Sequence, residues 1–439
     1  GTPPDEARAI AVKVLEMETR IARKKLSPVD KQDPNKLFTR MRYPELKALL
    51  SEVDLDSYFR FLGLPTDGEV IVMEVEALRE RNAMLASYPG TDTRAYLRWE
   101  LVRRTAQFLG PAFVEPGMEF NRAMYGKLDT PPLAKRVAAG VPKLLGHPVS
   151  QLYVDKYFPV ERKRAVEELV GRIKAEYRGR LVNNQWLTPP TRQYAIEKLD
   201  KIEISVGYPE KWIDYSQVDV RRDDYLGNVF RINTFKVRRE LAKLGKPVTN
   251  DLFATPGETL AVDANAGYSP DRNGIEIPAA FLQPPTYDPK ADPATNFCTI
   301  GAVIGHEMTH GFDSGGRHYD EIGRARNWWV KADEVKFNRE TKKLVRQSSA
   351  FKVLPDLHAN GELTVTENLA DVGGIAFAYG ALNKYLKAYP EKNVVIDGLT
   401  PIRDRDCGQA SPSRAMRLTL VIWSTLRKWV LVPELYSNP

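Results

Sequence analysis

Residues 301–313 read Gly-Ala-Val-Ile-Gly-His-Glu-Met-Thr-His-Gly-Phe-Asp, and His306, Glu307 and His310 make this stretch an HExxH motif. Positions four apart on a helix share one face, so both imidazoles can reach a single Zn²⁺ at about 2.0–2.1 Å. Glu307, one residue along, then faces the metal-bound water and can accept its proton. Taken alone, the motif is also compatible with a chance match on a buried helix.

A second pair of residues at the same spacing supplies carboxylates. A catalytic zinc needs a third protein ligand and an open fourth position. Glu367 and Asp371 stand four residues apart in an apolar stretch that continues with Gly373 and Gly374. Buried carboxylates need partners, and a metal ion and a metal-bound imidazole are suitable ones. We expect Glu367 to ligate zinc and Asp371 to orient a ligand histidine; for this segment alone, a capped helix start is the alternative.

The composition excludes several classes of protein. The chain has 439 residues, 43% of them apolar and 28% charged, which is typical of globular domains. No apolar run approaches the eighteen residues of a membrane helix, so no transmembrane segment is expected. The net charge of +7 comes with basic clusters at 23–25 and 162–164, but glutamates lie close to both on helical patterns. We interpret them as solvated faces and expect no nucleic-acid partner.

The predicted secondary structure changes near residue 240. Residues 5 to about 240 are expected to be mostly helical, because apolar residues recur there at helical spacing. Short extended stretches and turns follow, and a mixed helix is expected to begin near Thr299. We place a domain boundary at 235–245. The expected helices include 70–87, 93–109 and 191–203, and the expected strands are 260–262 and 274–277.

Three blocks together resemble a known family, the neprilysin-type zinc metallopeptidases. The blocks are residues 303–313, residues 367–374, and residues 265–285 with Asn-Ala-Gly-Tyr at one end and Pro-Ala-Ala-Phe-Leu-Gln-Pro-Pro at the other. The likeness covers about residues 5–400. It implies a mainly α fold with a small β-sheet: a two-lobed zincin in which a helical lobe, residues 1–240, encloses the active site of a thermolysin-like catalytic domain, residues 241–439.

The resemblance also implies a role for each matching residue. One Zn²⁺ per chain is expected, with Glu307 as general base. Asp371 and Asp313 would each contact a ligand histidine. Asn265 and Ala266 match residues that pair with the substrate backbone, which agrees with the way an extended peptide adds to a sheet edge. The implied zinc ligands are His306, His310 and Glu367, and the implied apolar pocket for the residue after the cut is Phe281, Ala302 and Val303. Thr286 stands where relatives usually carry an aromatic residue.

The function implied by the resemblance is zinc-dependent endopeptidase activity. The substrates would be oligopeptides cut on the amino side of apolar residues, with Glu307 taking a proton from the zinc-activated water. The few cysteines, Cys298 and Cys407, favour a bacterial-like member over the disulfide-rich animal relatives. An extracytoplasmic location is favoured over a cytoplasmic one, although the sequence leaves the compartment open.

The sequence departs from the family at both ends. The family's oxyanion-stabilising histidine near the C-terminus has no counterpart, since no histidine follows His358, and the pattern is lost from residue 401 onward. Genuine divergence, an altered reading frame and a misassigned sequence all fit this departure. A zinc-bound but catalytically silent relative that binds peptides or acts as a scaffold is therefore the alternative function. At the other end, we expect that a missing N-terminal fragment or a second chain completes the helical lobe.

Overall fold

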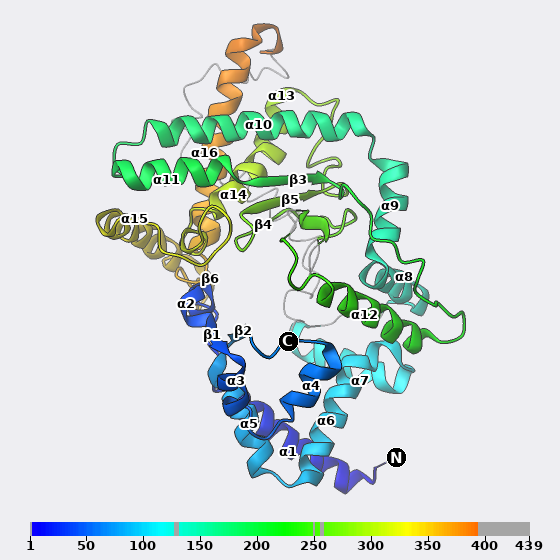
Figure 1. Cartoon of the computed structure of the whole chain (residues 1–439). Coiled ribbons are helices and arrows are strands. Elements are labelled where there is room, and N and C mark those ends of the chain that lie inside the picture. Colours follow the sequence, from blue (N-terminus) through cyan, green and yellow to red (C-terminus); the bar gives the residue numbers. More distant parts are fainter. Residues whose placement is uncertain (1, 127–130, 249–250, 255–258, 394–439) are drawn as a thin grey trace. The chain divides into compact units, whose positions relative to one another are not determined.

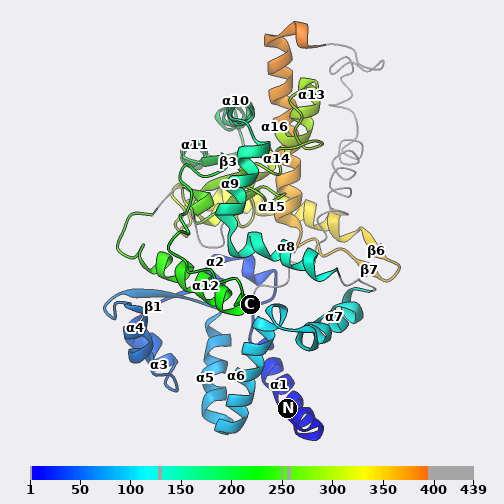
Figure 2. The same cartoon turned by 90° about the vertical axis from the view of Figure 1, so that its right-hand side faces the viewer.

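The structure is a computed structural model that describes residues 2–126, 131–248, 251–254 and 259–393 (Figures 1 and 2). The chain forms two compact units, and it passes from one to the other more than once. The first unit is Gly1–Leu145 with Asp214–Val248, and the second is Gly146–Ile213 with Thr249–Pro439. The C-terminal departure from residue 401 lies outside the described residues.

The first unit is mainly helical. The stripe expected near the N-terminus is present, because Val14, Met17 and Ile21 are buried on one helix. The expected helix 70–87 is wrong at its start: Glu69–Met73 form strand β2, which pairs antiparallel with β1 (Phe38–Arg42). The run of β-branched residues Val70, Ile71 and Val72 favours a strand once a partner is available. Its elements are α1 (Pro4–Ala22), α2 (Pro34–Leu37), β1 (Phe38–Arg42), α3 (Tyr43–Leu49), α4 (Leu55–Leu62), β2 (Glu69–Met73), α5 (Val75–Ser87), α6 (Gly90–Thr105), α7 (Pro111–Tyr125), α8 (Leu133–Leu144) and α12 (Tyr225–Leu241).

The second unit has a three-stranded sheet packed against helices. The strand order is β3 (Glu203–Gly207), β5 (Gly274–Pro278), β4 (Gly267–Ser269). Strand β3 is parallel and β4 antiparallel to the buried central strand β5. Ile275 and Ile277 of β5 join a core to which α10, α14 and α16 also contribute. The elements are α9 (Gly146–Tyr157), α10 (Val160–Val182), α11 (Pro189–Asp200), β3 (Glu203–Gly207), η3 (Leu252–Ala254), β4 (Gly267–Ser269), β5 (Gly274–Pro278), α13 (Pro293–Asn296), the π-helical turn η4 (Phe297–Gly301), α14 (Ala302–His310), η5 (Gly316–His318), α15 (Lys331–Ser349), β6 (Lys352–Leu354), β7 (Leu357–His358) and α16 (Val365–Ala388).

Three local expectations in this unit need correction. The expected strand 260–262 is a turn and loop segment, and no strand among the described residues pairs with it. The expected helix 191–203 ends at Asp200, and the chain continues as β3. The helix expected near Thr299 begins earlier, at Pro293, where the Asp292 side chain accepts the Thr295 N–H as an N-cap.

The two compact units divide the chain differently from the expected boundary near 240. Residues 146–213 belong to the second unit because they supply α10, α11 and β3 to its core and sheet. Strand β3 pairs with β5 from Glu203–Gly274 to Gly207–Pro278, so residues on both sides of the expected boundary form one sheet. The division into functional lobes at residue 240 stays a prediction.

Helices α14 and α16 cross in close contact, and this crossing is what brings the two sequence motifs together. A Cβ atom added to Gly305 would lie 2.9 Å from the Gly374 Cα, and one added to Gly374 would lie 2.4 Å from the Ala302 carbonyl oxygen. Only glycine allows backbones to approach so closely. The glycines of both motifs therefore set the distance between the histidines of α14 and the carboxylates of α16.

The expected fold class, mainly α with a small β-sheet, is confirmed (Figure 1). Among the described residues, no helix combines the length and the apolar character that a membrane span requires. The enclosure of the site by a helical lobe stays a prediction.

Candidate metal centre

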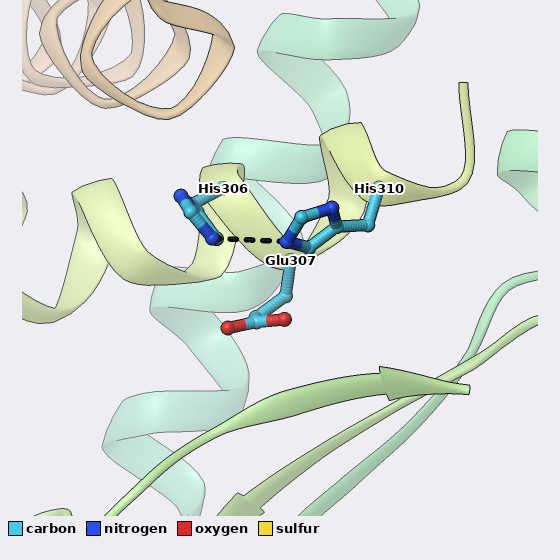
Figure 3. A group of neighbouring side chains, drawn as sticks. All are labelled: His306, Glu307 and His310. Atoms are coloured by element: carbon cyan, nitrogen blue, oxygen red, sulfur yellow. Dashed lines mark hydrogen bonds between the residues drawn. The ribbon is translucent and has the colours of Figure 1, made fainter. Parts of the chain in front are cut away.

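The helix α14 places both motif histidines on one face. Their Nε2 atoms lie 3.0 Å apart, and Figure 3 shows the two imidazoles facing each other while Glu307 points toward the neighbouring strands. His306 and Glu307 are only 6% and 7% exposed. Helical pitch puts the two histidines on this face, since residues four apart come to lie one above the other.

The carboxylate of Glu367, in the first turn of α16, completes a triangle with the two imidazoles. Its Oε2 lies 3.4 Å from Nε2 of His306 and 3.7 Å from Nε2 of His310. Donors bound tetrahedrally to one zinc at about 2.0–2.1 Å lie about 3.4 Å from one another. The three atoms thus have the spacing of three corners of a zinc site.

Glu307 also brings a carboxylate oxygen within 4.8 Å of a ring nitrogen of each histidine. Two carboxylates therefore compete for the role of third ligand. The shorter Glu367 distances favour Glu367, which leaves Glu307 beside the site. Glu367 is also the more exposed of the two, with 57% of its side chain accessible, so it can adjust to an ion at low cost.

Each imidazole is held through its other ring nitrogen by an aspartate. Nδ1 of His306 lies 2.9 Å from Oδ1 of Asp371, and Nδ1 of His310 lies 2.7 Å from Oδ2 of Asp313. Each carboxylate accepts a hydrogen bond from the Nδ1–H group, which keeps the proton on Nδ1 and leaves a lone pair on Nε2 of each neutral ring. Two lone pairs facing each other at 3.0 Å repel unless a cation or a proton lies between them. This donor set therefore fits a metal ion.

The electrostatics of the site favour positive charge. Burial lowers the pKa of His306, but the hydrogen bonds to Asp371 and Glu367 outweigh it and raise this pKa to about 10. Burial also lowers the pKa of His310, but the hydrogen bond to Asp313 outweighs it and raises this pKa above its ordinary value. The carboxylates that stabilise protonated imidazoles would equally stabilise a divalent cation.

The residues expected to bind the substrate backbone lie beside a terminal strand. Asn265 and Ala266 directly precede β4, the last strand in the order β3-β5-β4. Asn265 is exposed and Ala266 is buried. This location agrees with the addition of a peptide at the sheet edge. Their role in substrate binding stays a prediction.

The residues expected to form the apolar pocket pack in the core of the second unit. Phe281 and Ala302 are buried members of that core, and Val303 packs against it partly buried. Thr286 is buried as well. The structure thus places these side chains near the start of α14 or within its supporting core, and their role in specificity stays a prediction.

Several buried charged residues were not predicted from the sequence, and two of them are Lys198 and Glu276. Lys198 and Glu276 are 0% and 8% exposed. Lys198 follows Thr191 and Ala195 at helical spacing, and all three are buried on one face of α11. A lysine at helical spacing from residues on the buried face could therefore have been predicted to be buried. Glu276 sits between Ile275 and Ile277, and nothing in that alternation distinguishes it from a solvent-facing residue.

Glu276 should make the stability of the protein depend on pH. Its Oε2 has no hydrogen-bond partner among the described residues, and Oε1 accepts from the Thr259 hydroxyl at 3.2 Å. Burial raises the pKa of this carboxyl from 4.5 to about 7. Between these two pH values the folded protein retains a proton that the unfolded chain has released, so stability falls as pH rises.

We expect Glu276→Gln to remove that dependence. The shift from 4.5 to about 7 corresponds to at most about 3 kcal/mol, so the variant should gain on the wild type by up to that amount between pH 5 and 8. Urea unfolding at several pH values measures it, with Glu210→Gln at an exposed position as control. Parallel stability curves for wild type and Glu276→Gln would contradict the prediction.

Comparison with known proteins gives one consistent group of relatives. Two family models, both described as peptidase family M13, match residues 1–209 and 265–403. Neprilysin-1 of Caenorhabditis elegans is 31% identical over 402 residues, covering 86% of this chain and 52% of that protein. Human neprilysin is 29% identical over 405 residues, covering 87% of this chain and 54% of that protein. The chain thus spans about half the length of the curated relatives it matches.

Solved structures agree with these matches. The zinc metalloprotease Zmp1 of Mycobacterium tuberculosis, in complex with an inhibitor, superimposes with a TM-score of 0.83 at 35% identity, covering 90% of this chain and 60% of that one. PepO from Lactobacillus rhamnosis superimposes with a TM-score of 0.79 at 27% identity, covering 89% and 62%. The fold and the sequence therefore point to the same relatives.

Proposed function

Because the chain belongs to peptidase family M13, we propose that it is a zinc-dependent endopeptidase that cuts oligopeptides on the amino side of apolar residues. The observation that carries this proposal is the triangle formed by His306, His310 and Glu367, with distances of 3.0, 3.4 and 3.7 Å between their donor atoms. The buried carboxylate of Glu307 lies next to it.

One Zn²⁺ per chain would be held by His306, His310 and Glu367. Two imidazoles and one carboxylate are a donor set found in zinc peptidases, and the fourth position stays open for water or substrate. When bound, zinc lowers the pKa of water from 15.7 toward about 7 and polarises a carbonyl group.

The chain's own residues would carry the proton transfers. Glu307 accepts a proton from the attacking water and delivers it to the leaving amine. Its carboxylate lies within 4.8 Å of a ring nitrogen of each histidine, while the carboxylate of Glu367 lies closer to both and is left as the ligand. Asp371 and Asp313 keep the protons of His306 and His310 on Nδ1, so that both Nε2 atoms stay available. Glu307 is 7% exposed, and such burial strengthens electrostatic interactions at its carboxylate.

The substrate would lie along the terminal strand of the sheet. Asn265 and Ala266 would bind its backbone and align the scissile carbonyl with the site, since an extended peptide pairs readily with a sheet edge. Phe281, Ala302 and Val303 would favour an apolar side chain after the cut.

One sequence observation favours a second candidate function. The family resemblance implies an oxyanion-stabilising histidine near the C-terminus, and this sequence has no histidine after His358. Loss of one such donor typically lowers turnover about 10²–10³-fold without abolishing metal binding. The second candidate is therefore a protein that binds zinc and peptides but does not cleave them.

Cleavage of a quenched fluorescent peptide tests the choice. We expect hydrolysis of a peptide with Phe or Leu after the scissile bond, its loss on adding a zinc chelator, and its return on adding Zn²⁺. A matched peptide with Glu at that position should be cut far more slowly. A chain that holds one zinc, binds the peptide and leaves it intact would instead establish the silent protein.

A further inference from the structure

Lys198 is a buried lysine that contacts the segment following the metal-centre residue His310. It lies on α11, is 0% exposed, and its Nζ donates to the carbonyl oxygens of Gly316 at 2.8 Å and Tyr319 at 2.7 Å. The rings of Phe312 and Trp328 lie 5.6 and 5.8 Å from the ammonium. Both carbonyls belong to the segment that follows His310, so the lysine ties this segment to α11.

A chain of hydrogen bonds leads from this lysine to a histidine of the site. The N–H groups of Gly315 and Gly316 donate to Oδ1 of Asp313 at 2.8 and 2.7 Å. The other oxygen, Oδ2, accepts from Nδ1 of His310 at 2.7 Å. Gly316 thus contacts Lys198 through its carbonyl oxygen and Asp313 through its N–H.

Burying a lysine side chain at this position costs free energy, which indicates that its charge or its N–H donors serve a purpose there. Burial lowers the pKa of Lys198 to about 7, while Asp313, Asp320 and Glu321 act in the opposite direction. An ammonium group without a carboxylate in direct contact is expensive to bury. An apolar residue would fill the same stripe of α11 at lower cost, but each carbonyl would lose one of its two donors. Gly316 would keep the Tyr319 N–H at 3.0 Å, and Tyr319 would keep the indole N–H of Trp328 at 2.9 Å, so among the described residues only Lys198 joins the two carbonyls to α11.

We propose that Lys198 is a positioning residue for the metal centre: by holding the carbonyls of Gly316 and Tyr319, it fixes the loop whose N–H groups orient Asp313. Asp313 in turn orients His310. The inference rests on the proposed role of His310 as a zinc ligand, and it adds a residue from α11 that touches neither metal nor substrate.

Zinc affinity of the full 439-residue chain tests this proposal independently of peptide cleavage. Competition with a chromophoric chelator should show that Lys198→Met weakens zinc binding about tenfold, the lower end of what loss of an outer hydrogen-bond partner costs. Lys174→Met is a matched control. Its Nζ also donates to two backbone carbonyls, those of Asp200 at 3.0 Å and Ile202 at 3.2 Å, outside the segment that follows His310. It should leave zinc affinity unchanged.

A double-mutant cycle with Asp313→Asn separates positioning from general packing. If Lys198 acts through Asp313, adding Lys198→Met to Asp313→Asn should cost little further zinc affinity. A full tenfold loss in that background would overturn the proposal, as would wild-type affinity in a folded Lys198→Met variant. If the methionine variant does not fold, Lys198→Gln keeps one donor group and should show a smaller loss; wild-type affinity would again overturn the proposal.

The same titration distinguishes this inference from the proposed function. A wild-type chain that binds no zinc would remove both. A wild-type chain that binds zinc with the same affinity as folded Lys198→Met would remove only the role of Lys198.

Discussion

Replacing Glu307 with glutamine should abolish peptide cleavage and leave zinc bound. The amide has nearly the same shape as the carboxylate but cannot accept the proton of the attacking water. General-base catalysis typically contributes about 10²–10⁴-fold to rate, so a loss of at least that size is expected. Because the carboxylate is 7% exposed and burial raises its pKa, a neutral amide should not destabilise the fold.

The measurement combines cleavage of the quenched peptide with zinc analysis of the purified variant. Glu362→Gln, at an exposed position before α16, controls for a change of charge near the site. Cleavage by Glu307→Gln at the wild-type rate would eliminate Glu307 as the base. Loss of zinc in this variant would instead indicate that Glu307 is a ligand, as its oxygen within 4.8 Å of both rings allows.

Replacing Glu367 with alanine should strip the metal. Oε2 of Glu367 is the only carboxylate atom found within 3.7 Å of both Nε2 atoms among the described residues. Without it, two imidazoles remain, and a two-ligand site is too weak to hold zinc through purification. The loss of affinity should exceed the about 10–100-fold that removal of an outer hydrogen-bond partner costs.

Metal analysis and chelator competition check this second prediction. Because the Glu367 side chain is 57% exposed, its truncation should leave the unfolding free energy nearly unchanged, which separates metal loss from misfolding. Glu362→Ala serves as the matched control on the same segment. One zinc per chain in Glu367→Ala would rule Glu367 out as a ligand.

The candidate site was predictable from the sequence to the extent that it depends on helical spacing. The pairs His306–His310 and Glu367–Asp371 are each four residues apart, and the pitch of a helix puts each pair on one face whatever surrounds it. The structure brings Asp371 to His306 and Asp313 to His310. Their catalytic and ligand roles stay predictions until the variants are measured.

Other features depend on contacts between distant parts of the chain, and periodicity does not report those. Strand β3 exists because residues 203–207 pair with residues 274–278, so a helix expected to run to 203 ends at Asp200. Strand β2 likewise requires β1 as its partner. A strand's hydrogen bonds all go to another segment, whereas a helix satisfies its own.

Local chemistry along the chain was sufficient to predict the donor atoms and the two helices that carry them, and to identify the family. The packing of α14 on α16 at Gly305 and Gly374 then sets the distances among those atoms, and the sequence contains the glycines without stating which backbone each will meet. Lys198 belongs to this second group: its ammonium reaches Gly316, 118 residues further along the chain, only after α11 has packed. Which residues share a helix face follows from their spacing in the sequence. The angle and distance between two packed helices depend on the side chains of the whole core.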